Sequence, residues 1–455
     1  MFANRTERFR HNPPQSNYGV AIVDLDDDGE FEIVVASNGG RNLALKRDGA
    51  EFVSCADDTL ADHGAQAIGL AAGDIDGDGR EELYILNTDT FNGVKSISDR
   101  LFDWREGRWV DLFALPEHMA AANLTAGRSV ACLDRMGSGR YGFFVANYGG
   151  PMALFELDAH DELENVAAAA GVGLSTGGRG LLALPLLPDS TRPDIFVGNE
   201  GGANFLFRNQ GDGTFEEIGQ PMGLGDMHEN ARGVAACDLN HDGVFDIAIA
   251  NWEGPNRLFV WDKDRFRDVA PRFFAEPTRA RTLLAADFNN DGHEELFLNN
   301  MGQPNRLFGW KNKRWQALDP GDALEPGGLG TGAAVGDFDH DGRLELIVSH
   351  GETAPQPLSY YHTPDNGNHW LRVQPLTQFG APARGAVVRL LAGGRTQIRG
   401  IDAGSGYLCQ MEPVAHFGLG AMDQAEWVEI MWPDGKTKRL EKVEARQVIR
   451  VEYPG

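Results

Sequence analysis

The segment GVAIVDLDDDGEFEIVVAS, residues 19–37, decides the fold, because close copies of it recur along the chain. The copies are GLAAGDIDGDGREELYILN at 69–87, GVAACDLNHDGVFDIAIAN at 233–251, LLAADFNNDGHEELFLNN at 283–300 and GAAVGDFDHDGRLELIVSH at 332–350. In each copy an apolar run leads into an acidic loop, and a second apolar run leaves it. Short apolar runs bounded by turn residues are typical of β-strands. Self-similarity at a fixed period indicates a repeat architecture.

Two degenerate copies complete the series. They are VACLDRMGSGRYGFFVAN at 130–147, with its loop starting at Asp134, and LLALPLLPDSTRPDIFVGN at 181–199, with Pro185 in place of the first aspartate. The seven loops then begin at residues 24, 74, 134, 185, 238, 287 and 337, which is a period of about 50 residues. The chain therefore contains seven related units within residues 1–365.

Each unit has room for four strands. A third apolar run follows the pair around the acidic loop, as in NRLFVW at 256–261, and a fourth follows a tight turn such as NQGDGT at 209–214. Four short strands joined by turns form one blade of a β-propeller. We therefore predict an all-β protein with a seven-bladed β-propeller. The seventh unit lacks a fourth strand, and we expect the N-terminal strand RTERFR, residues 5–10, to complete it and close the ring.

The acidic loops have the ligand pattern of a calcium site. In the first loop, oxygen-bearing side chains stand at positions 1, 3, 5 and 9, and Gly29 stands at position 6, where a sharp turn is needed. Calcium prefers six to eight oxygen ligands from carboxylates, backbone carbonyls and water. Position 7 contributes its backbone carbonyl, which explains why its residue type varies. The sequence therefore predicts about five structural Ca²⁺ sites.

The predicted metal-binding residues are Asp24, Asp26, Asp28, Glu30 and Glu32; Asp74, Asp76, Asp78, Arg80 and Glu82; Asp238, Asn240, Asp242, Val244 and Asp246; Asp287, Asn289, Asp291, His293 and Glu295; and Asp337, Asp339, Asp341, Arg343 and Glu345. An EF-hand is excluded because position 12 is apolar in all five loops, as at Val35 and Ile85. The alternative is that the loops are ordinary Asp-Gly hairpin turns. The loops at Asp134 and Pro185 are expected to hold no metal.

Composition limits the function classes. The chain has 455 residues and a formal net charge of −26, so nucleic acid is not an expected partner. No apolar run is long enough to span a bilayer. The first fifteen residues lack the apolar core of a signal peptide, so a cytoplasmic location stays an alternative to secretion. GxSxG, HExxH and Walker motifs are absent, and we predict no catalytic residues.

The last part of the chain, residues 366–455, is predicted to form a second, smaller β-domain. Turns at 392–395 and 433–436 separate alternating strands. The segments NHWLRV, GAVVRLLAGGRTQIR, HFGLG and WVEIMWPDGKTKRL resemble the ASPIC/UnbV domain, and the upstream units resemble FG-GAP/VCBS repeats of integrin α subunits. This combination resembles the cartilage acidic protein family and its bacterial homologues. The resemblance implies an extracellular or periplasmic calcium-binding protein, without established enzymatic activity and with adhesion-type roles.

Four arginines form a further candidate site. Arg128, Arg179, Arg232 and Arg281 each lie six residues before the loop anchor of four consecutive units. First strands line a propeller's channel, so the four side chains should gather at one side of its mouth and bind an anion such as a carboxylate or a sulfated sugar. The alternative is pairing with rim acids such as Glu200 or Glu253.

The leading hypothesis is thus a monomeric, non-enzymatic binding or adhesion protein whose propeller is stabilised by Ca²⁺ and whose ligand is a protein or an anionic glycan. The alternative is a calcium-dependent polysaccharide lyase that uses the channel mouth. Such an enzyme needs a base beside its cation, whereas the predicted metal loops lie on the opposite face.

Overall fold

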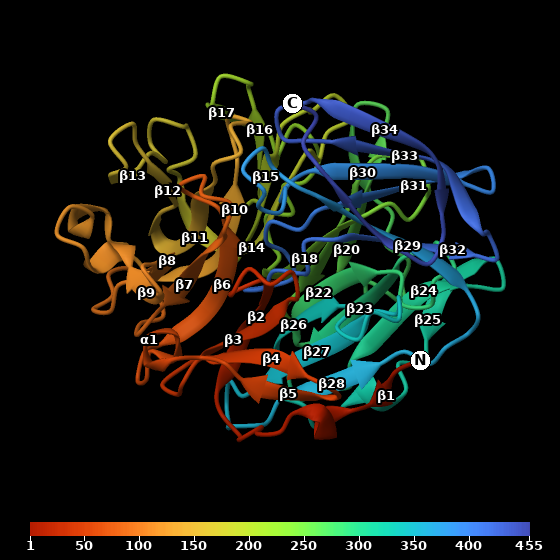
Figure 1. Cartoon of the computed structure of the whole chain (residues 1–455), viewed down its shortest axis with the longest axis horizontal. Coiled ribbons are helices and arrows are strands. Elements are labelled where there is room, and N and C mark those ends of the chain that lie inside the picture. The colour runs from red at the N-terminus through yellow and green to blue at the C-terminus, as the bar shows by residue number, and fades with distance from the viewer.

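The computed structural model describes all 455 residues, and it is built almost entirely of β-strands. Seven four-stranded antiparallel units follow one another along the chain, and the first strands of neighbouring units contact each other in a closed cycle from β2 through β26 and back to β2. The predicted all-β propeller is therefore confirmed (Figure 1). None of its helices has the length and apolar character needed to cross a membrane.

The strands of the first four blades are as follows. Blade 1 holds β2 (Asn17–Val23), β3 (Glu32–Ser37), β4 (Leu43–Asp48) and β5 (Glu51–Ser54); blade 2 holds β6 (Ala67–Gly73), β7 (Glu82–Asn87), β8 (Arg100–Arg105) and β9 (Arg108–Asp111). Blade 3 holds β10 (Gly127–Leu133), β11 (Gly142–Pro151), β12 (Ala153–Leu157) and β13 (Leu163–Asn165); blade 4 holds β14 (Ser175–Leu184), β15 (Asp194–Asn199), β16 (Phe205–Asn209) and β17 (Phe215–Glu217). Blades 3 and 4 are also joined to each other, because β11 pairs with β14.

The remaining blades repeat the plan. Blade 5 holds β18 (Ala231–Cys237), β19 (Asp246–Asn251), β20 (Arg257–Asp262) and β21 (Arg265–Asp268); blade 6 holds β22 (Ala280–Ala286), β23 (Glu295–Asn300), β24 (Arg306–Lys311) and β25 (Arg314–Leu318). Blade 7 holds β26 (Gly330–Gly336), β27 (Glu345–His350), β28 (Ser359–His362) and β1 (Ala3–Asn4). The helical segments are short: α1 (Asp58–Ala61), η1 (Thr6–Arg8), η2 (Leu112–Ala114), η3 (Met119–Ala121) and η4 (Asp322–Leu324).

The N-terminal strand closes the ring, as expected, but its position was predicted wrongly. The strand is Ala3–Asn4, which pairs with His362 and Tyr361, and it does not lie within 5–10. The Asn4 side chain accepts a hydrogen bond from the backbone N–H of Thr6 at 2.9 Å, which turns the chain into η1 and ends the strand. Phe2 is buried against Phe288, where it anchors this strand in the core.

The C-terminal domain contains two sheets. One is β32 (Ala415–Gly420), β29 (His369–Pro375) and β35 (Val448–Val451), and the other is β31 (Arg395–Gly400), β30 (Val387–Ala392), β33 (Gln424–Met431) and β34 (Thr437–Glu444). They enclose a core of their own that includes Trp432 and Phe417. The predicted boundary at 365/366 falls between β28 and β29. In Figure 1 these blue strands lie across one side of the ring.

One connection of the C-terminal domain enters the propeller. Residues 403–411, between β31 and β32, form what we call the axial segment, and they are almost fully buried. Its backbone bonds to the first strands of four blades: Gln410 to Val20 and Ile22, Leu408 to Leu70, Ala403 to Cys132, and Gly406 to Val234. First strands line the centre of a propeller, so the axial segment fills the channel.

Candidate metal hairpins and the channel mouth

The five predicted metal loops all connect the first and second strands of a blade, and their shape is fixed by their own carboxylates. In blade 1 the two Asp24 oxygens accept the backbone N–H groups of Asp28 and Gly29 at 3.2 and 2.8 Å. The same pattern recurs from Asp238, Asp287 and Asp337. Gly29 has a φ of 88°, which glycine adopts without the steric cost of a Cβ atom.

The position-9 carboxylate closes each loop from the other side. One oxygen of Glu32 accepts the N–H of Leu25 at 2.8 Å, and Glu82, Asp246, Glu295 and Glu345 repeat this bond to the second residue of their loops. The second oxygen of Glu32 and that of Asp246 are buried without a hydrogen-bond partner. A buried acceptor without a partner costs about 1–3 kcal/mol, so these atoms fit the ligand set of a bound cation.

Burial gives these carboxyl groups unusual protonation behaviour. Desolvation, reinforced by neighbouring aspartates, raises the pKa of Glu32 and of Asp74 to about 7 and that of Asp246 to about 8. A bound divalent cation would supply the positive charge that lets such groups stay ionised at neutral pH.

The side-chain oxygens of three loops converge. The sets Asp24, Asp26 and Glu32; Asp74, Asp76 and Asp78; and Asp337, Asp339 and Asp341 each place one carboxylate oxygen per residue within 4.8 Å of the others. In blade 5 the Asn240 amide donates to Asp242, and in blade 6 the Asn289 amide donates to Glu295. At position 7, the Glu30 and His293 side chains belong to none of these sets, and the Arg343 side chain pairs with Asp341 of its own loop.

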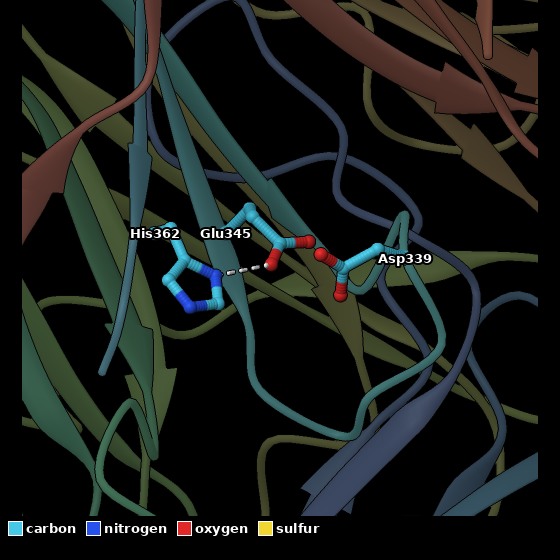
Figure 2. A group of neighbouring side chains, drawn as sticks. All are labelled: Asp339, Glu345 and His362. Carbon is cyan, nitrogen blue, oxygen red and sulfur yellow. Dashed lines mark hydrogen bonds and ion pairs between the residues drawn. The ribbon is translucent and has the colours of Figure 1, made fainter. Parts of the chain in front are cut away.

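Residues on the third strand also reach these clusters, and sequence reasoning missed them. The register places Lys46 opposite Glu32, Asp103 opposite Glu82 and His362 opposite Glu345. Asp103 forms a second acidic set with Asp76 and Glu82. Figure 2 shows His362 pointing toward Glu345, with Nδ1 3.1 Å from a carboxylate oxygen, and Asp339 on the other side.

In blade 1 the third-strand residue at this position is a lysine, whose ammonium group is positively charged. The Lys46 ammonium lies 2.5 Å from an Asp26 oxygen, 2.6 Å from an Asp28 oxygen and 3.7 Å from a Glu32 oxygen. Among the five predicted metal hairpins, only the hairpin of blade 1, hairpin 1, has a lysine or arginine at this third-strand position.

The two degenerate loops keep the turn but carry no cluster of three or more potential ligand side chains. Asp134 accepts the N–H groups of Ser138 and Gly139 at 2.9 and 2.7 Å, and its neighbour Arg135 pairs with Glu156. In the loop that begins at Pro185, the buried Asp194 carboxylate accepts backbone bonds from Leu186 and from Asn209.

The hairpin face of the propeller is covered by the C-terminal domain. Arg372 is buried between Asp337, at 3.1 Å, and Glu412. The backbone N–H of Gly418 donates to Asp287 at 3.0 Å. The first aspartates of hairpins 6 and 7 thus bond both to their own loop and to the second domain, so the two parts share the same carboxylates.

The four arginines lie together at the opposite end of the channel. Arg179 and Arg232 both pair with Glu200, and Arg179 also donates to the Tyr407 hydroxyl of the axial segment at 3.3 Å. Arg281 pairs with Glu352. The other rim acid that the sequence suggested, Glu253, pairs instead with Arg279, outside the cluster.

Comparison with known proteins agrees with this architecture. An FG-GAP-like repeat model matches residues 24–85, 191–249, 238–298 and 287–348, and the ASPIC and UnbV model matches residues 377–455. The chain is 48% identical over 97% of its length to cartilage acidic protein 1 of Xenopus tropicalis, of which it covers 74%, and equally to that of Homo sapiens, of which it covers 73%. The chain belongs to the cartilage acidic protein 1 family.

The resemblance inferred from the repeats and the C-terminal motifs is thereby confirmed. Among solved structures, the crystal structure of BBS1N in complex with ARL6DN, soaked with mercury, covers 80% of this chain and 98% of that chain with a TM-score of 0.51 at 11% identity. At that identity the likeness is one of fold alone. The match of the ASPIC and UnbV model begins at residue 377, eleven residues after the predicted start of the C-terminal domain at 366.

Proposed function

We propose that this protein is an extracellular, calcium-stabilised binding protein without catalytic activity. The observation that carries the proposal is one hairpin repeated in five blades, in which the position-1 and position-9 carboxylates bond to the loop backbone. In three of these hairpins the side-chain oxygens converge, and one oxygen each of Glu32 and Asp246 is buried without a hydrogen-bond partner. Scattered surface acids do not repeat in register. The relatives are named as acidic proteins of cartilage, which supports an extracellular setting.

Calcium would act here as a structural ion, supplying positive charge to oxygens that the fold has already gathered. The carboxylates of the chain hold the loops in shape. The position-1 and position-9 carboxylates tie each loop at both ends, and Asp287 and Asp337 extend these bonds to the C-terminal domain. Loss of the ion would expose each hairpin to repulsion between its carboxylates and loosen the contact between the domains.

The filled channel favours binding over catalysis. The lyase hypothesis requires a base near a cation at the channel mouth, but the hairpins lie at the other end and the axial segment separates the two. The acids that face the arginines, Glu200 and Glu352, are both held in ion pairs.

Melting curves test the proposal directly. Protein is measured by calorimetry with 2 mM CaCl₂ and with excess EGTA, and bound metal is counted by elemental analysis in both samples. We expect several calcium ions per chain and a lower melting temperature after their removal. Calcium-free protein that melts at the same temperature would refute a structural role, and degradation of acidic polysaccharides by the calcium-loaded protein would refute the absence of catalysis.

A further inference from the structure

A ring of re-aimed side chains surrounds the channel mouth. In every blade the first strand breaks register with the second near its start, and the one or two residues in each break include Tyr18, Ile68, Arg128, Arg179, Arg232, Arg281 or Thr331. A β-bulge of this kind turns a side chain away from the strand's normal alternation and is over-represented beside functional sites. Four consecutive blades use the bulge to present arginine.

The charge of this arginine cluster is not balanced. Glu200 pairs with Arg179 and Arg232, and Glu352 pairs with Arg281, whereas Arg128 donates only to the backbone carbonyls of Thr90 and Phe91. Four guanidinium groups therefore face two carboxylates, in a protein whose net charge is −26. The site carries an excess of about two positive charges where the rest of the molecule is acidic.

The arginines also hold unused hydrogen-bond donors. Each of the four residues is at most 8% exposed, and the Nε atoms of Arg128, Arg232 and Arg281 are buried with no acceptor. A guanidinium offers five donors in a fixed planar arrangement that matches the oxygens of carboxylate and sulfate groups. An anion at this place would provide acceptors that the protein itself lacks.

Aromatic rings alternate with the guanidinium groups. Arg179 stacks on Tyr148 at 4.5 Å and Arg281 on Trp252 at 4.4 Å, while Arg128 lies 5.2 Å from the Phe91 ring centroid. Phe91 is 62% exposed although it is a large apolar side chain. An exposed aromatic ring beside charged donors suits a ligand that has both an apolar face and anionic groups.

The C-terminal domain completes the site from below. Tyr407, in the axial segment, contacts Arg179 through its hydroxyl and is surrounded by all four arginines, which together lower the pKa of Tyr407 against the opposing effect of burial. Because the axial segment fills the channel behind it, Tyr407 forms a floor, and a ligand would have to enter from the outer face.

We propose that this arginine cluster binds an acidic saccharide, with the guanidinium groups of Arg128 and its neighbours holding carboxylate or sulfate oxygens and a sugar ring lying on Phe91 or Trp252. A pyranose ring presents a flat face of C–H groups next to its acidic substituents, whereas the side chains of an Asp- and Glu-rich peptide present no such face. The inference deepens the binding function proposed above by naming the ligand class.

The test measures binding of a chondroitin sulfate hexasaccharide by isothermal titration calorimetry in 150 mM NaCl and 2 mM CaCl₂. Comparison ligands are the desulfated hexasaccharide, which keeps only carboxylates, free sulfate, neutral chitohexaose and an Asp-Glu hexapeptide. We expect binding of one or both acidic hexasaccharides and none of chitohexaose. Absence of binding to both acidic saccharides at millimolar concentration, or equal affinity for the hexapeptide or chitohexaose, overturns the proposal.

Variants locate the site. Arg128→Gln removes the arginine that has no carboxylate partner, and we expect it to weaken saccharide binding about tenfold or more. Arg41→Gln is the matched control, because Arg41 lies in the β3–β4 connection on the same face, is half exposed and pairs only with Asp58. Equal losses in the two variants would show a nonspecific charge effect and refute the site.

Phe91→Ala provides a second test of the site, because this exposed ring can be removed without opening the core. This substitution should lower the affinity for the hexasaccharide several-fold and leave the affinity for free sulfate unchanged. An unchanged affinity for the hexasaccharide would refute the role of the ring. The calcium-dependent melting shift is measured on every variant. A normal shift without saccharide binding refutes this inference alone, whereas loss of the shift in wild-type protein refutes the proposed calcium role.

Discussion

Replacing Lys46 by glutamine should increase the calcium affinity of hairpin 1. The Lys46 ammonium lies within 3.7 Å of oxygens from Asp26, Asp28 and Glu32, and an ion held by the same carboxylates would share this space with it. Two unit charges about 4 Å apart interact by about 1 kcal/mol in water. Asp26 and Asp28 are about half exposed, so the aqueous value applies. A divalent ion is then repelled by about 2 kcal/mol, which corresponds to about a thirtyfold change in affinity.

The same substitution has an opposite effect without calcium. Lys46 neutralises part of the acidic cluster, and its partly exposed ion pairs each contribute about 0–1 kcal/mol. Lys46→Gln should therefore melt slightly lower than wild type in EGTA and gain more from added calcium.

Titration calorimetry from micromolar to millimolar calcium measures the change, and calcium-soaked crystals of both proteins show which hairpin fills. Arg208→Gln is the control, because the register of β15 and β16 places Arg208 at the equivalent position of blade 4, where it pairs with Asp189 and no metal is expected. Identical calcium isotherms for wild type and Lys46→Gln would refute the reasoning. So would a wild-type crystal in which hairpin 1 fills at the lowest calcium concentration.

Three further outcomes follow from the same structure. Asp103→Asn should weaken calcium binding at hairpin 2 about tenfold in a titration, while Asp262→Asn, on a partly exposed third-strand position outside the clusters, should not. Burial raises the pKa of Glu32 to about 7 and of Asp246 to about 8, whereas the pKa of each group is about 4 in the unfolded chain. Calcium-free folded protein therefore binds more protons than the unfolded chain, and its melting temperature should fall as the pH rises from 5.5 to 8.5. A melting temperature that stays constant or rises over this range would contradict this. Gln410→Leu should cost about 1–3 kcal/mol in denaturant unfolding, because the Gln410 amide bonds to both backbone groups of Ala72, and the exposed Gln424→Leu should cost far less.

The repeated segment was sufficient to predict the blade plan and the placement of the acidic loops. Its period survives in all seven units, and the glycine and aspartate positions depend only on local turn geometry, as the bonds from Asp24 show. The C-terminal turns at 392–395 and 433–436 were equally local, and they lie between β30 and β31 and between β33 and β34.

What could not be predicted depends on contacts between distant residues. Lys46 follows Glu32 by fourteen residues and Asp103 follows Glu82 by twenty-one, because the connection after the second strand varies in length. No fixed spacing therefore marks the third-strand residues. The axial segment carries no repeat pattern, and its bonds to β2, β6, β10 and β18 cross more than 150 residues of sequence.

The N-terminal strand β1 and the axial segment come from opposite regions of the chain, and this has a consequence for biosynthesis. Residues 3–4 are translated before all seven blades, yet they can pair only after β28 has been made. Residues 403–411 are translated after all seven blades, yet the first strands of four of these blades carry backbone groups that bond to this segment. A nascent chain still held by the ribosome at residue 400 would therefore have an open bore with unpaired backbone groups. Final consolidation would come only after synthesis has passed residue 411, as a single late step.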